Sequence, residues 1–103
     1  MALTYDAREV FVERARKSRR YRIAILGEVL ECIADGEANT ARDLLRDYVQ
    51  AVGSKKVARL VCKEPQAVMR MLRPSSNPSL DNISKLLASL RKHEGVEPRV
   101  NAG

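Results

Sequence analysis

Residues 54–73 read Ser54-Lys55-Lys56-Val57-Ala58-Arg59-Leu60-Val61-Cys62-Lys63-Glu64-Pro65-Gln66-Ala67-Val68-Met69-Arg70-Met71-Leu72-Arg73. Apolar residues recur at helical spacing on both sides of a short break, which predicts two short helices, from about Lys55 to Val61 and from about Pro65 to Leu72. Two helices joined so closely form a helix-turn-helix when a small residue stands where they cross. Ala58 fits that position, with Cys62 at the turn and Val68 packing back against Ala58.

The second short helix then has a polar outer face made of Glu64, Gln66, Met69, Arg70 and Arg73. In a helix-turn-helix this face enters the major groove of DNA. Gln66 can read adenine through N6 and N7, and Arg70 can read guanine through O6 and N7. We therefore assign base reading to Gln66, Met69 and Arg70. Glu64 either caps the helix that Pro65 begins or accepts a hydrogen bond from cytosine.

Ser54 and Lys55 stand at the start of the first short helix, where backbone amides and the helix dipole favour a phosphate. Together with neighbouring basic and polar residues they form the predicted phosphate contacts: Ser54, Lys55, Lys56, Arg73, Ser75, Ser76, Asn77 and Ser79. Residues 54–73 carry six basic side chains and one acidic one. The alternative is an ordinary helical hairpin whose basic residues only face solvent.

The charge of the whole chain points the same way. The 103 residues have a formal net charge of +6, and residues 1–53 are balanced, with 9 basic and 9 acidic side chains. Residues 54–103 have 10 basic and 4 acidic side chains. Such a basic half suggests a polyanionic partner, because neutralising phosphates releases condensed counterions. A solvated basic surface that only keeps the protein soluble is the other interpretation.

The rest of the chain also has helical periodicity and no sustained alternation of a strand. Asp6 is expected to cap a first helix that ends near Ser18, and Ser18 to cap a second that Asp35 and Gly36 stop. A third helix starts at Asn39 or Thr40 and ends at Gly53. Ser79 caps the last helix. Inward-facing residues are predicted at Ala7, Val10, Phe11 and Ala15 in the first helix and at Leu80, Ile83, Leu86, Leu87 and Leu90 in the last.

The fold class that follows is all-α, a compact bundle of five to six helices. The second helix has so broad an apolar surface that burial on more than one side is expected, as a central helix or a subunit interface. We divide the chain into residues 1–37, which are expected to provide a dimer or partner contact, the helix-turn-helix domain 38–95, and a tail 96–103 that is either flexible or forms a short edge strand from Val96 to Val100. Six basic residues near the first turn are interpreted as a solvated corner: Arg14, Arg16, Lys17, Arg19, Arg20 and Arg22.

Several classes of protein are disfavoured by composition. Cys32 and Cys62 lie in apolar patterns, show no zinc-ligand spacing and are expected to be reduced core thiols of a cytoplasmic protein. No metal or cofactor site is expected. The only histidine, His93, has no nucleophile spaced to use it, so we expect no enzymatic activity. No signal peptide is expected, and no stretch approaches the ~18 apolar residues of a membrane span.

From about residue 38 to residue 96 the chain resembles the Xre/Cro-type, HigA-like antitoxins, and closest of all the addiction-module antidote proteins of bacterial type II toxin-antitoxin systems. Four segments carry the resemblance: Ala41-Arg42-Asp43-Leu44-Leu45-Arg46-Asp47-Tyr48, Pro65-Gln66-Ala67-Val68-Met69-Arg70-Met71-Leu72, Asn77-Pro78-Ser79 and Arg91-Lys92-His93-Glu94-Gly95-Val96. One departure is Cys62, which stands where such proteins commonly have a turn glycine.

This resemblance implies a lambda-repressor-like helix-turn-helix in a bacterial, cytoplasmic antidote. It implies that the protein neutralises a RelE/ParE/HigB-like toxin and represses the shared operon by binding operator DNA as a homodimer. Residues 1–37 would then contact either the second subunit or the toxin. The DNA-contacting positions of the family correspond to Ser54, Gln66 and Arg70. Two alternatives stay open: a protein-interaction module that does not bind DNA, and a stand-alone Xre-type regulator.

Overall fold

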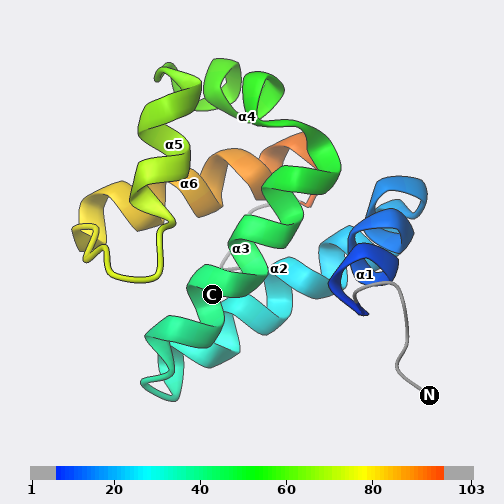
Figure 1. Cartoon of the computed structure of the whole chain (residues 1–103), viewed down its shortest axis with the longest axis horizontal. Coiled ribbons are helices and arrows are strands. Elements are labelled where there is room, and N and C mark those ends of the chain that lie inside the picture. Colours follow the sequence, from blue (N-terminus) through cyan, green and yellow to red (C-terminus); the bar gives the residue numbers. More distant parts are fainter. Residues whose placement is uncertain (1–6, 97–103) are drawn as a thin grey trace, which may run out of the picture.

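The computed structural model describes residues 7–96, and these form six α-helices and no strand (Figure 1). The all-helical prediction is confirmed. Except for Val96, the expected edge strand and the Asp6 cap lie outside the described residues. None of the helices within 7–96 combines the length and the apolar character needed to span a bilayer. The helices are α1 (Ala7–Lys17), α2 (Arg19–Ala34), α3 (Ala38–Val52), α4 (Ser54–Val61), α5 (Pro65–Met71) and α6 (Leu80–His93).

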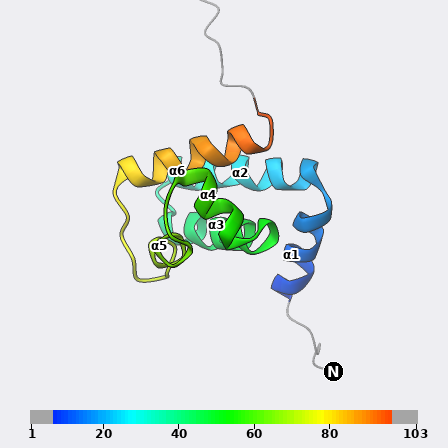
Figure 2. The same ribbon diagram turned by 90° about the horizontal axis from the view of Figure 1, so that it is seen from above.

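The core lies between two layers of helices. Figure 2 shows α2 and α6 along one side of the molecule and α3 and α5 on the other. α1 packs across α2 and α3, and α4 contacts α3, α5 and α6. Every helix contributes buried side chains, and the largest that are fully buried are Tyr48, Leu26, Leu45, Leu72, Leu86 and Leu90.

Most helix ends agree with the sequence. Ser18 caps α2 by accepting a 3.1 Å hydrogen bond from the amide of Tyr21, and Ser79 caps α6 through the amide of Asn82, also at 3.1 Å. Gly36 has φ +79°, and the amide of the next residue donates to the carbonyl of Cys32 at 2.8 Å. This pairing satisfies a carbonyl that would otherwise be orphaned at the end of α2.

Three expectations are wrong, one about where a helix begins and two about which side of a helix is buried. α3 begins at Ala38, so Asn39 and Thr40 lie inside it, and its N-cap Glu37 makes no side-chain capping bond. Glu37 completes the turn that closes α2 and also stands at the N-cap of α3, so α3 begins earlier than expected. In α1, Ala15 is buried as expected and Phe11 packs partly buried against the core. The other buried residue is Val12, whereas Ala7 is exposed and Val10 is 49% exposed. Leu80, in the first turn of α6, is 79% exposed because the helix reaches the core only from Leu86 onward, after half-buried Ile83.

A buried ionic cluster joins α2, α3 and the end of α6. Glu94 is 2% exposed and is hydrogen-bonded by Arg22 Nε at 2.7 Å and by the Tyr48 hydroxyl at 2.6 Å. Arg19 Nε donates to the carbonyl of Glu94 at 2.7 Å. The expected solvated basic corner is therefore wrong for Arg22, which stabilises the carboxylate from within the fold.

The α2 surface is only partly covered in one chain. Ile25, Leu26, Val29 and Cys32 are buried, but Leu30 remains 40% exposed and Ile33 38% exposed. The expectation that α2 is buried on more than one side is thus not met within residues 7–96. A second apolar face of the helix is left in contact with solvent.

Candidate nucleic-acid interface

α4 starts where the chain leaves α3 through Gly53. Gly53 has φ +107°, a backbone conformation that residues other than glycine rarely adopt. It ends α3 and directly precedes α4. Val57 and Ala58 are buried, at 0% and 3% exposure, and anchor α4 in the core. Lys55 and Lys56 are consequently directed to solvent on the other side of the helix, and Ser54 is half-buried at its start.

Cys62 closes α4 in the left-handed conformation, with φ 56° and ψ 46°. The amide of Lys63 donates to the carbonyl of Ala58 at 2.9 Å, and that of Cys62 to the carbonyl of Arg59 at 3.3 Å, the bond pattern of a left-handed helix end. Cys62 is the only non-glycine residue within 7–96 with positive φ.

The two thiols differ in environment. Cys62 is exposed, so the expectation of a core thiol is wrong there. It stands in the turn after α4, whose buried residues are Val57 and Ala58. Cys32 is buried as expected. Burial raises the pKa of the Cys32 thiol, and the carboxylates of Glu37 and Glu28 raise it further. A thiol that stays protonated is a poor nucleophile.

α5 begins with Pro65 at its first position, after an extended Glu64 whose side chain makes no capping hydrogen bond. Glu64 therefore stands at the N-cap by position alone. Val68 and Leu72 are both fully buried, in the same core cluster as Ala58. Gln66 and Arg70, four residues apart on the opposite side, are exposed. Met69 differs from expectation: it is only partly exposed and packs against the core.

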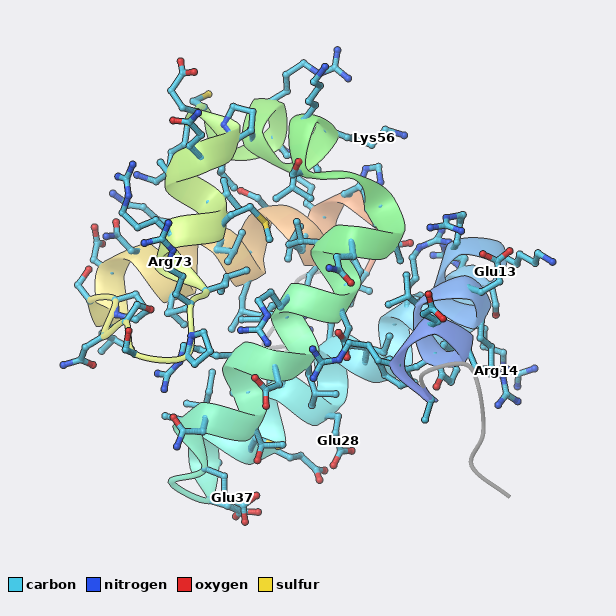
Figure 3. The ribbon with its side chains drawn as sticks, viewed as in Figure 1. Glu13, Arg14, Glu28, Glu37, Lys56 and Arg73 are labelled. Atoms are coloured by element: carbon cyan, nitrogen blue, oxygen red, sulfur yellow. The ribbon has the colours of Figure 1, made fainter. Side chains whose placement is uncertain are left out.

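The exposed sides of α4 and α5 and the residues that follow each helix form a basic ridge, which we define as Lys55, Lys56, Arg59, Lys63, Arg70 and Arg73. All six side chains are exposed, and none forms an ion pair with another residue of the described chain. Figure 3 shows Lys56 and Arg73 pointing outward on this side, with Glu28 and Glu37 at the other end of the molecule. Positive charge is thus available on the ridge for an external anion.

The loop after α5 is fastened to α3. Arg42 Nη2 donates to the carbonyl of Pro74 at 3.2 Å, and Arg46 Nη1 donates to the carbonyl of Leu72 at 3.3 Å. Arg46 Nη2 also forms an ion pair with Asp43, at 3.4 Å. Sequence reasoning missed the role of the two arginines in positioning the loop.

The loop residues predicted to contact phosphate have unequal freedom. Ser75 and Asn77 are exposed. The Ser76 hydroxyl donates to the carbonyl of Met71, and Ser79 is occupied in capping α6. A hollow of about 300 Å³ beside α5 brings basic and polar side chains together, and its lining includes Lys63, Arg70, Ser76, Asn77 and Asn82.

Groups of three or more His, Cys, Asp or Glu side chains that could hold a metal ion do not occur within residues 7–96. No protein-family model, curated protein sequence or solved structure matches the chain.

Proposed function

We propose that the chain is a sequence-specific DNA-binding protein in which α4 and α5 act as a helix-turn-helix of the Xre/lambda-repressor type. One observation carries the proposal: Gln66 and Arg70 are exposed on one side of α5, while Val68 is buried on the other together with Ala58. A recognition helix needs this division, because one side is fixed to the supporting helix and the other reaches base edges.

In this proposal Arg70 reads guanine and Gln66 reads adenine in the major groove. Phosphates are contacted from the two ends of the helix pair and from the following loop, by Ser54, Lys55, Lys56, Arg73, Ser75 and Asn77. Ser76 and Ser79 take a smaller part than expected, since their hydroxyls are used within the chain. Met69 contributes only an apolar edge.

We further propose that the DNA is the operator of the chain's own operon, and that the protein is the antitoxin of a type II module. It would bind operator DNA as a homodimer and neutralise a RelE/ParE/HigB-like toxin. The resemblance of residues 38–96 to addiction-module antidote proteins supports this part. A dimer is expected because a single short recognition helix gives little affinity. Two such helices, bound to half-sites one helical turn apart, would combine their binding energies.

The DNA-binding part is tested by fluorescence anisotropy with the duplex upstream of the chain's own gene and a scrambled duplex of equal length. We expect tighter binding to the upstream duplex, and a steep loss of affinity for both as salt rises. Equal affinity for the two duplexes would show that binding is not sequence-specific. Binding to neither, at low salt, would favour a protein-interaction module instead.

The antitoxin part needs a separate experiment. Co-expression with the product of the adjacent small reading frame is expected to relieve growth arrest caused by that product, and the two proteins should co-purify. Operator binding without either effect would identify a stand-alone regulator.

A further inference from the structure

α2 has a second apolar side that the fold does not cover. With 100° per residue, Ile23, Gly27, Leu30 and Ala34 lie on the side opposite the buried Ile25 and Val29, and Ala24 borders them. Leu30 is 40% exposed, Ile23 is half-buried, and Ala24, Gly27 and Ala34 are exposed. A helix that is apolar around most of its circumference is typical of one buried on more than one side. We call these five residues the outer face of α2.

Gly27 lies at the middle of this face. Glycine inside a helix lowers its stability relative to alanine. A β-carbon built at residue 27 would meet no atom within 4 Å, so no contact among the described residues requires glycine there. Glycine does permit the backbone of another helix to approach closely.

The charges on either side of Gly27 have opposite sign. Arg19 and Arg20 begin the helix, and Glu31 and Asp35 stand at its end. Arg20 and Glu31 are exposed on the same edge of the outer face, and neither forms an ion pair with another residue among those the structure describes. Arg19 is held by the carbonyl of Glu94.

Such a helix is complementary to a copy of itself turned end for end. Arg20 precedes Gly27 by about 10 Å along the axis, and Glu31 follows it by about 6 Å. If two helices cross antiparallel at Gly27, Arg20 stands about 4 Å along the axis from Glu31 of the second copy, which an arginine side chain can span. A two-fold axis keeps the same edge of both helices together. In a parallel pair the two-fold axis runs along the helices, so equivalent residues stand level with each other on opposite edges, and Arg20 cannot pair with Glu31.

We propose that the outer face of α2 is the dimer interface, packed antiparallel on the same face of a second copy, with Gly27 at the crossing and Arg20 paired with Glu31 of that copy. The inference rests on the dimer expected in the proposed function and adds the surface and the orientation. It uses no residue of the basic ridge.

The crossing point is tested by cross-linking without DNA. Gly27→Cys is introduced in a Cys62→Ser chain, so that the exposed native thiol is removed while the buried Cys32 stays in place. Under mild oxidation this chain is expected to give a covalent dimer, because residue 27 meets its own counterpart. The matched control is Gln50→Cys, an exposed position on α3, which should stay monomeric on a non-reducing gel.

The orientation is tested by exchanging charges, with the mass measured by light scattering. Arg20→Glu and Glu31→Arg should each weaken the dimer about tenfold, because both symmetric pairs are replaced by repulsion. The double variant should restore the dimer. Circular dichroism checks that each variant is folded, as expected for exposed positions.

Three results would overturn the inference, and they separate it from the proposed function. A dimer that does not cross-link at residue 27 places the interface elsewhere and leaves the proposed function intact. If the two charge changes weaken the dimer additively, and the double variant does not restore it, the antiparallel pairing of Arg20 with Glu31 is excluded. A protein that stays monomeric at every concentration, or whose α2 binds only a different protein, would exclude both the interface and the expected homodimer. DNA binding is measured independently of this result.

Discussion

The hydroxyl of Tyr48, in the second half of α3, donates a 2.6 Å hydrogen bond to Oε2 of Glu94, which follows the last turn of α6. Arg22 of α2 binds both oxygens of the same carboxylate, at 2.7 and 3.2 Å. Burial alone would raise the pKa of Glu94, but the hydrogen bonds from Arg22 and Tyr48 outweigh it and lower the pKa below its ordinary value of 4.5. For Tyr48, burial and the bond to Glu94 both raise the pKa.

Glu94→Gln is therefore expected to destabilise the fold by about 3 kcal/mol at neutral pH, because Arg22 loses its buried partner. A lowered carboxyl pKa means that the stabilisation is complete above the ordinary pKa and is lost as pH falls through the pKa of the folded state. The gap between wild type and variant in urea unfolding should thus narrow below about pH 4.5. Asp81→Asn, an exposed carboxylate paired with Lys85, is the control and should change stability by under ~0.5 kcal/mol.

If the difference between wild type and Glu94→Gln were the same at pH 3 and pH 7, the carboxylate would not be the stabilising form. The cluster would then act through packing alone.

This cluster marks the limit of what the sequence could predict. Helix order and most helix ends follow from local signals such as Ser18, Ser79 and Gly36, which act within a few residues. Arg22 and Glu94 are 72 positions apart, and no local signal pairs them. The basic neighbours of Arg22 made it look like a surface residue.

The direction of a helix's buried side was also beyond local reasoning in places. Periodicity places Val10 and Leu80 on apolar stripes, but whether a stripe meets the core depends on where neighbouring helices lie. At the candidate site the apolar signal was more reliable. Val57, Ala58 and Val68 are buried, and Gln66 and Arg70 are exposed, because two helices held so close along the chain must pack on each other. The hydrogen bonds from Arg42 and Arg46 to the carbonyls of Pro74 and Leu72 could not be predicted, because they depend on the path of the loop after α5.

Cys62→Gly should stabilise the protein. Cys62 has φ 56°, where a side chain with a β-carbon is strained and glycine is not. Because glycine also adds freedom to the unfolded chain, the net gain is expected to be about 0.5 to 1 kcal/mol in chemical unfolding. Cys62→Ala keeps the β-carbon and serves as the control, with little change expected. A gain with alanine equal to that with glycine would show that the thiol, rather than the backbone, is unfavourable.

The double variant Lys55→Ala, Lys56→Ala should bind every duplex more weakly by the same factor. Both side chains are exposed at the start of α4 and are assigned to phosphates, and each lost phosphate contact lowers the slope of log affinity against log salt by about 0.9. We expect the slope to fall by about 2, with the ratio between upstream and scrambled duplex unchanged. Lys17→Ala, Lys92→Ala removes the same charge from α1 and α6 and should leave the slope nearly as it was. A slope equal to wild type in the Lys55, Lys56 variant would place the phosphates elsewhere.

Arg70→Ala should abolish much of the discrimination between the upstream and the scrambled duplex while leaving the fold intact. Arg70 is exposed on α5 and has no ion pair among the described residues, so its removal exposes no buried group. A bidentate arginine–guanine contact is worth about 1 to 3 kcal/mol of discrimination, so the affinity ratio should fall between about 5-fold and 150-fold. The comparison is Arg59→Ala, which removes the same charge from the neighbouring helix of the ridge and should preserve the ratio even if overall affinity drops. Anisotropy titrations at one salt concentration measure both ratios side by side. Equal ratios in the two variants would mean that Arg70 contributes only charge, and α5 would then not be the element that reads the bases.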